Sequence, residues 1–231
     1  MPISCGGATS STPSSAPAAG ETVGEASGAD HGYSDAVQRG VDTLLVVATS
    51  PVWVALLVAA LGATGLVTGR PLFFRQTRMG RDCRPFTIHK LCTMRSGPPP
   101  PGALFEGWTY AGDPRVTRLG ALLRRYRIDE LPQFWNVLRG DMSLVGPRPE
   151  PYEIASRLGR EVPGYHARHA VRPGITGLCQ ISPAYRDFGT VEKSARKLQY
   201  DLEYVRRRTF GLYCRILWRT VAVLLRGEGM A

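Results

Sequence analysis

The chain has 231 residues and a mass of 25.2 kDa, and 43% of its residues are hydrophobic. This is enough for one compact domain of about 150 to 200 residues with appendages, and it excludes a multidomain machine. The net charge of +10 lies beyond the N-terminal stretch, because no Lys or Arg precedes Arg39. Such a basic body requires an acidic partner: nucleic acid, anionic lipid or a phosphorylated substrate. Five scattered cysteines without a C-x-x-C pair argue against a disulfide scaffold or structural zinc and favour a reducing compartment.

Residues 1–34 are rich in Ala, Gly, Ser, Thr and Pro, a composition that cannot bury enough apolar surface to fold. We therefore expect a disordered tail. It contains no Lys or Arg, which is unlike a targeting signal.

Residues 43–68 carry no charge. As one helix they would extend about 39 Å, against a hydrocarbon core of roughly 30 Å, so the segment belongs in a membrane. Pro51 should kink the helix next to Ser50 and leave arms of about 10 and 16 residues, neither of which crosses a bilayer alone. Hydropathy favours a kinked spanning helix and leaves a re-entrant hairpin open, and arginines beyond both ends favour a cytoplasmic location for both ends.

The rest of the chain predicts an α+β domain. Residues 72–76 and 86–91 are typical of two strands that form a hairpin through a turn at 79–82. The proline run at 98–101 indicates a stiff, exposed connection. Thr117 is placed to cap a basic amphipathic helix, and residues 131–138 indicate a second short helix that ends at Gly140. A buried strand is predicted at 142–145 and a tight turn into a strand at 172–177.

Two helices are predicted over about residues 191–225, with a break near Thr209 and Gly211. The last one mixes large apolar residues with arginines. It could lie in a lipid interface or pack on its own domain, and the sequence favours neither.

The adjacent carboxylates of Asp129 and Glu130 are the leading candidates for chemistry. Placed at a helix start after several arginines, they could hold a divalent cation and face a phosphorylated ligand. Asp129 could also act as a nucleophile on phosphorus, and we expect nearby cations to keep its pKa low. The alternative is an ordinary helix cap with an acidic first turn.

Three basic residues are candidate anion contacts. Arg148 stands between two prolines that stiffen its backbone, which suits bidentate phosphate recognition. Lys90, at a strand end, could contact a phosphate as a point charge, and Arg172 begins a glycine-rich turn. Each of them could instead be an ordinary structural or surface residue. His166 and His169 are three residues apart, but no third metal ligand is evident nearby.

Nucleotide-hydrolase, dinucleotide and serine-hydrolase motifs are absent from the sequence. An ordered set of other motifs is present. It comprises residues 113–120 (DPRVTRLG), 129–133 (DELPQ), 136–138 (NVL), 140–149 (GDMSLVGPRP), 172–177 (RPGITG) and 197–204 (KLQYDLEY), together with Gln76, Arg78, Gly80, Lys90 and Gln180. With these motifs the chain resembles the bacterial sugar transferase family, the monotopic phosphoglycosyl transferases, over nearly everything from Arg39 onward.

The resemblance implies a proline-broken re-entrant membrane helix at residues 35–70, hinged at Ser50 and Pro51, and a cytoplasmic catalytic domain at 71–231. It therefore reverses the preference for a spanning helix. The implied location is the cytoplasmic face of the bacterial inner membrane, with the lipid bilayer as a partner. A homo-oligomer is compatible with it, and nucleic acid is not an expected partner.

The resemblance also implies a reaction, the first membrane step of surface glycan synthesis. Asp129 attacks the sugar-bearing phosphate of a UDP-sugar, UMP leaves, and undecaprenyl phosphate takes the phosphosugar from the aspartyl intermediate. Glu130 is the implied ligand of a Mg²⁺ cofactor. The implied substrate-binding residues are Lys90, Arg148, Arg172 and Arg115.

Three residues depart from the family pattern: Cys83 replaces a common hairpin glycine, Cys92 a usual arginine, and Arg127 a small hydroxyl residue. Cys92 and Arg127 motivate one alternative, a catalytically silent membrane protein that acts in assembly. A nucleic-acid-binding protein would explain the charge but not the apolar segment, and the chain lacks interleaved aromatic residues for stacking on bases. A single-span anchor would place the N-terminus outside the cell.

Overall fold

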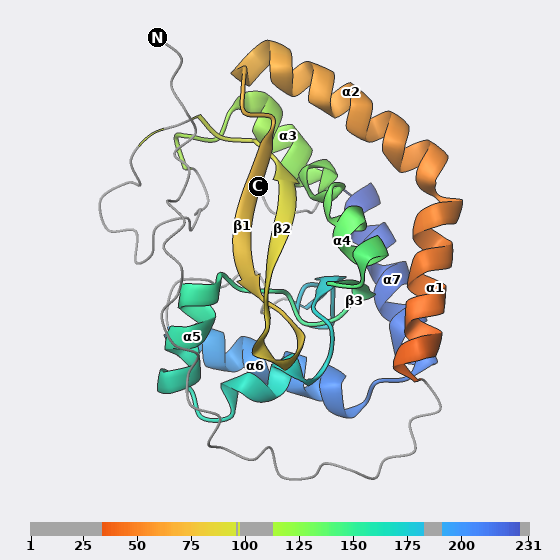
Figure 1. The fold of residues 1–231 in the computed structure, drawn as a ribbon, viewed down its shortest axis with the longest axis vertical. Helices are drawn as coiled ribbons and strands as arrows, with labels where there is room; N and C mark the ends of the chain where they lie inside the picture. The colour runs from red at the N-terminus through yellow and green to blue at the C-terminus, as the bar shows by residue number, and fades with distance from the viewer. Residues whose placement is uncertain (1–33, 96, 98–112, 183–190, 227–231) are drawn as a thin grey trace.

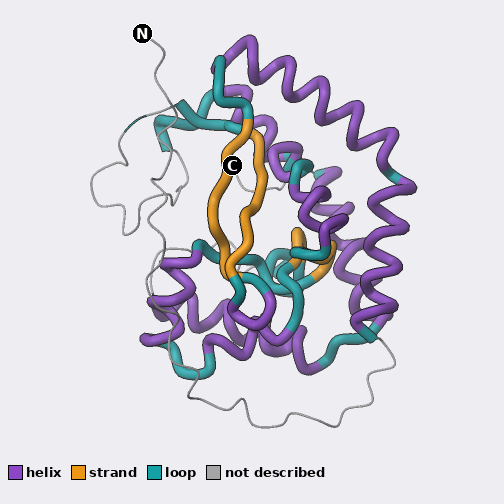
Figure 2. The backbone as a smooth tube through the Cα atoms, viewed as in Figure 1, coloured by secondary structure: helices purple, strands orange, loops and turns teal. Residues whose placement is uncertain are grey.

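The computed structural model describes residues 34–95, 97, 113–182 and 191–226. The expected tail up to residue 33 and the proline run at 98–101 lie outside the described residues. Helices dominate and two small sheets lie among them, which confirms the α+β class (Figure 2). The elements are α1 (Asp35–Ala48), α2 (Ser50–Thr68), β1 (Phe73–Met79), β2 (Pro85–Leu91), α3 (Arg118–Arg125), α4 (Gln133–Arg139), β3 (Ser143–Val145), α5 (Tyr152–Glu161), β4 (Gly174–Thr176), α6 (Val191–Arg206) and α7 (Phe210–Leu225).

The apolar segment forms two helices, α1 and α2, which meet at a bend at Thr49 (Figure 1). Pro51 lies in the first turn of α2, where a missing N–H breaks no helical hydrogen bond, so the break falls just before Ser50. The arms have 14 and 19 residues, longer than predicted. Ser50–Val67 is long and apolar enough to cross a membrane by length and composition, with 11% of it buried. The prediction that neither arm could cross alone is therefore wrong for α2.

The N-terminal half of helix α1 is polar, and its side chains anchor the helix in the domain by hydrogen bonds. Gln38 is buried and donates through Nε2 to Ser143 Oγ at 2.6 Å and to the Val145 carbonyl at 2.9 Å. Asp42 is also buried, and its Oδ1 accepts from Leu144 N and from the Tyr213 hydroxyl. These contacts fix the N-terminal half of α1 against β3 and α7.

Strands β1 and β2 pair antiparallel, with Phe73 opposite Leu91 and Met79 opposite Pro85. The hairpin is longer than predicted, because β1 continues to Met79 and the turn follows it at Gly80. In that turn Cys83 has φ +57°, a left-handed conformation that favours glycine. Figure 1 shows the two strands running down the middle of the molecule, from the α2–α3 end to the end formed by α5 and α6.

The predicted strand at 142–145 is confirmed as β3, and it pairs in parallel with β4. Close backbone approach at this sheet requires glycine: a Cβ on Gly146 would collide with the Arg172 carbonyl, and one on Gly174 with the Gly146 amide. Buried side chains of β3, α1, α4 and α7 surround the pair, among them Val46, Val137 and Ile216. The sheet therefore ties the segment that follows residue 140 to the glycine-rich turn.

The two C-terminal helices are confirmed, with Thr209 capping α7 through a bond from Leu212 N. One face of α7 packs on the domain through Tyr213 and Ile216. Another face carries exposed residues at helical spacing: Phe210, Cys214, Trp218, Val221 and Leu225. Helix α7 therefore packs on its own domain and also presents an apolar stripe outward.

Candidate active site

Asp129 and Glu130 lie on a short 3₁₀ turn, Ile128–Glu130, between α3 and α4. Helix α3 starts at the predicted cap, where Thr117 Oγ1 accepts from Gly120 N at 2.9 Å. Both carboxylates are buried, at 8% and 6% exposure. The residue before the turn, Arg127, has φ +54°, a costly conformation for an arginine that persists here because the helices on both sides fix the chain.

Glu130 is held by cations from three parts of the fold. Its Oε1 accepts from Lys90 Nζ at 2.8 Å and from Arg148 Nη2 at 2.6 Å. Its Oε2 lies 3.6 Å from Arg127 Nη1. The structure thus brings together four of the predicted site residues, namely Lys90, Asp129, Glu130 and Arg148, and adds Arg127, which sequence reasoning had treated only as a departure from a pattern.

The two carboxylates differ in their electrostatics. Burial and the neighbouring Glu130 raise the pKa of Asp129, against the attraction of Lys90. Burial alone would also raise the pKa of Glu130, but Arg148 and Lys90 hold it well below its usual range. The expectation that nearby cations keep the pKa of Asp129 low is therefore wrong for the free site, because burial and the charge of Glu130 outweigh the attraction of Lys90, Arg124 and Arg148.

Lys90 is itself strongly affected by the site. Burial lowers its pKa to about 8, although Glu130 opposes the shift. A second missed cation, Arg124, comes from the last turn of α3 and interacts electrostatically with Asp129 and Glu130. Its Nε donates to Thr93 Oγ1 at 2.8 Å. The run of arginines before the carboxylates in the sequence was the signal that pointed to Arg124 and Arg127.

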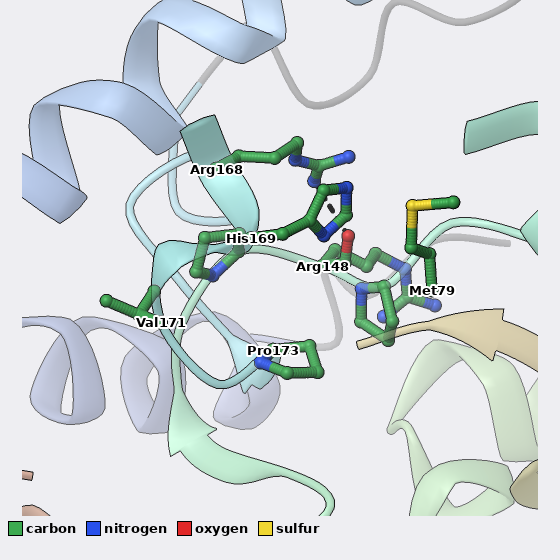
Figure 3. Close-up of a pocket in the computed structure, with 8 residues that line it drawn as sticks. Met79, Arg148, Arg168, His169, Val171 and Pro173 are labelled. Atoms are coloured by element: carbon green, nitrogen blue, oxygen red, sulfur yellow. Dashed lines mark hydrogen bonds between the residues drawn. The ribbon is translucent and has the colours of Figure 1, made fainter. Parts of the chain in front are cut away.

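Arg148 is presented by the PRP loop, Pro147-Arg148-Pro149, which follows β3. Arg78 of β1 donates through Nη1 to the Pro149 carbonyl at 2.9 Å, and Arg168 donates through Nη2 to the Arg148 carbonyl at 2.7 Å. Figure 3 shows Arg168 and His169 beside the backbone of Arg148, where all three line a small depression together with Met79 and Pro173. Arg168 thus holds the backbone of Arg148, while the side chain of Arg148 reaches Glu130.

Two predicted substrate-binding residues have protein partners away from Asp129 and Glu130. Arg115 makes a bidentate pair with Asp113, from Nε to Oδ1 at 3.0 Å and from Nη2 to Oδ2 at 2.7 Å. Arg172 donates through Nε to the Gly140 carbonyl at 3.1 Å, which holds the C-terminal end of α4. The structure places neither of them in contact with the two carboxylates.

The donor set suits a magnesium ion that is shared with a substrate. Glu130 Oε2 is buried and accepts no hydrogen bond, although Arg127 lies at ion-pair distance. Mg²⁺ keeps several waters and commonly uses one or two carboxylates together with substrate phosphates. Among the described residues no three His, Cys, Asp or Glu side chains form a metal site, and this includes the neighbourhood of His166 and His169. Asp129 and Glu130 therefore fit Mg²⁺ only jointly with a phosphorylated ligand.

The fold and the site together define a small α+β domain with a bent pair of apolar helices, α1 and α2, and with a buried carboxylate pair among arginines and a lysine. The family described as bacterial sugar transferase matches residues 33–227, and the chain belongs to this family.

Several curated proteins are similar to the chain over most of its length. One from Aeromonas hydrophila, named UDP-N-acetylgalactosamine-undecaprenyl-phosphate N-acetylgalactosaminephosphotransferase, is 38% identical over 84% of the chain and 44% of its own length. One from Caulobacter vibrioides, named UDP-glucose:undecaprenyl-phosphate glucose-1-phosphate transferase, is 39% identical over 83% of the chain and 70% of its own length. The exopolysaccharide production protein PSS of Rhizobium leguminosarum bv. phaseoli is 39% identical over 82% of the chain and 92% of its own length. The chain thus spans less than half of the Aeromonas relative.

Proposed function

We propose that this protein transfers a sugar-1-phosphate from a UDP-sugar to undecaprenyl phosphate and so starts the assembly of a surface glycan. The observation that carries the proposal is the excess of positive charge around the carboxylate pair. Four cationic side chains surround two carboxylates: Lys90, Arg124, Arg127 and Arg148. An anionic substrate such as a diphosphate balances this excess, and the names of the relatives supply its class.

The chemistry we propose has two displacement steps at one phosphorus atom. A carboxylate oxygen of Asp129 forms a bond to the phosphorus that carries the sugar, the bond from that phosphorus to the bridging oxygen breaks, and UMP leaves with the electron pair. A phosphate oxygen of undecaprenyl phosphate then attacks the same phosphorus and releases the Asp129 carboxylate. Neither step requires a net proton transfer to the protein.

The neighbours of Asp129 have complementary roles. Lys90 and Arg148 share Glu130 Oε1, and we expect them to hold phosphate oxygens when a substrate enters. Glu130 would bind Mg²⁺, which offsets diphosphate charge when present. Because the pKa of Asp129 is raised in the free site, we expect the cations recruited with the substrate to complete its ionisation.

The membrane placement is also part of the proposal. We infer that α1 and α2 form a re-entrant hairpin with its bend at Thr49–Pro51, so that both ends stay on the cytoplasmic face of the inner membrane. The anchoring of Gln38 and Asp42 in the domain supports it, since the N-terminal end of α1 is held on the same side as the catalytic residues. The exposed stripe of α7, flanked by the exposed Arg215 and Arg219, suits an anionic lipid interface.

The test is UMP release from a panel of UDP-sugars, with Mg²⁺ and undecaprenyl phosphate, by the full chain in detergent micelles. Asp129→Asn should abolish release. Glu203→Gln, which removes an exposed ion pair with Arg207 on α6, is the matched control and should leave the rate unchanged.

A second measurement tests the intermediate. With a donor labelled at the sugar-bearing phosphate and no lipid, the label should remain on the native protein after denaturation and be absent from Asp129→Asn. Turnover by Asp129→Asn would refute the covalent step. If folded native protein releases UMP from no donor, the catalytically silent alternative takes its place.

A further inference from the structure

A buried ion pair lies directly behind the PRP loop. Arg168 Nη2 is 2.7 Å from Asp201 Oδ2, and each side chain is 5% exposed. The same guanidinium donates from Nη1 to the Tyr165 hydroxyl at 2.6 Å and from Nη2 to the Arg148 carbonyl at 2.7 Å. One side chain therefore joins helix α6 to the backbone of the residue that contacts Glu130.

Stability alone does not explain this pair. Removing two charges from water costs more than their attraction returns in many proteins, and packed apolar residues often do better. What an apolar pair cannot supply is a directional donor to a carbonyl. Arg168 has such donors in a rigid fork, and Asp201 fixes the orientation of that fork.

We propose that Arg168 and Asp201 are positioning residues that hold the PRP loop in the conformation in which Arg148 reaches the substrate phosphate. The proposal rests on the proposed function, because it takes Arg148 as a phosphate contact. Neither residue touches the reacting atoms. Asp201 orients Arg168, and Arg168 fixes the Arg148 carbonyl, a bond that Figure 3 shows as a dashed line. The network extends to Asp201 of α6, which is more than 50 residues after Arg148 in the sequence.

The other contacts of the PRP loop fix the residues on either side of Arg148 and leave the Arg148 carbonyl to Arg168. Arg78 holds the Pro149 carbonyl, and Met79 N donates to the Glu150 carbonyl at 3.1 Å. These contacts fix the loop only after Arg148. On the opposite side Gly174 N donates to the Pro147 carbonyl at 2.9 Å. The carbonyl of Arg148 itself is the point between these two anchors, and Arg168 holds it.

The charges that face Asp201 give the network a pH signature. They are Arg168, Glu150 and Lys197, with the Tyr165 hydroxyl and the Cys179 thiol also close. Burial raises the pKa of Asp201 to about 6, although Arg168 opposes the shift. Protonation of Asp201 would release Arg168, so activity should fall as the pH drops through about 6, and Asp201→Asn should lack this acid limb.

The decisive experiment is a double-mutant cycle on the affinity for UDP, measured by titration calorimetry with the full chain in micelles. Asp201→Asn should weaken binding about tenfold, because a small displacement of a positioned group has a large effect. In an Arg148→Ala background the same substitution should change the affinity little, since the group it positions is gone. The control Glu203→Gln, on the same helix, should change neither.

Arg168→Lys is a second variant that tests the same contact if Asp201→Asn fails to fold. It keeps a cation beside Asp201 but loses the fork, and it should weaken binding only when Arg148 is present. Two results would overturn the positioning role while leaving the proposed function intact. One is an equal loss of UDP affinity with and without Arg148, and the other is no loss of affinity in the protein that keeps Arg148. If Arg148→Ala alone leaves UDP binding unchanged, the phosphate contact is wrong and the positioning role fails with it.

Discussion

His169 should make the protein sensitive to mild acid. It is 6% exposed and lines the same small depression as the PRP loop (Figure 3). Burial, with the nearby Arg168 and His166, lowers its pKa to about 2 from 6.5. The unfolded chain therefore binds a proton below pH 6.5 that the folded protein does not accept, and stability falls as the pH drops below 6.5. At pH 5.5 the loss is about 1.4 kcal/mol of unfolding free energy from this one group.

The measurement is denaturant unfolding at pH 7.5 and 5.5, followed by tryptophan fluorescence in micelles. His169→Asn is the comparison, because an amide retains a donor for the Gly80 backbone but does not titrate. The native protein should lose about 1.4 kcal/mol more than His169→Asn between the two pH values, since other titrating groups contribute equally to both. An equal loss in the two proteins would show that His169 is protonated in the folded state and that the reasoning is wrong.

Two further predictions concern the backbone. Arg127→Asn should be more stable than Arg127→Ala by up to about 1 kcal/mol, because asparagine tolerates the φ of +54° at this position. Both variants lose the ion pair with Glu130, so that loss cancels in the comparison. Equal stability of the two variants would contradict the strain argument. Gly120→Ala should lose about 2 kcal/mol, because its Cβ would collide with the Thr93 carbonyl, whereas Gly211→Ala, with no atom within 4 Å of an added Cβ, should gain up to about 1 kcal/mol. Thermal unfolding of the four variants decides both.

Much of the local structure could be predicted because its signals are local. The cap at Thr117 and the stop at Gly140 lie within one turn of the helix ends that they define. The apolar run predicted a membrane segment with a break at Ser50 and Pro51. The two helices meet at Thr49, directly before them, since proline is accepted in a first helical turn.

The sequence predicted the types of residue in the candidate site better than it predicted which residues contact one another there. Adjacent carboxylates and a proline-flanked arginine are recognisable in the sequence, and the structure brings Asp129, Glu130, Arg148 and Lys90 together. The sequence did not indicate that the Nε of Arg172 donates to the Gly140 carbonyl, because a short-range pattern does not specify which carbonyl lies within reach of a guanidinium.

The sequence by itself determined the class of the domain, its proline-broken apolar segment and the carboxylate pair, because helical periodicity, caps and turns depend on neighbours a few residues apart. Only the tertiary structure decided that Asp201 pairs with Arg168, that Arg168 binds the Arg148 carbonyl, and that α1 is anchored through Gln38. Such contacts join residues 20 to 107 positions apart. Their partners are selected by how the helices and sheets pack, and no periodicity along the chain records that packing.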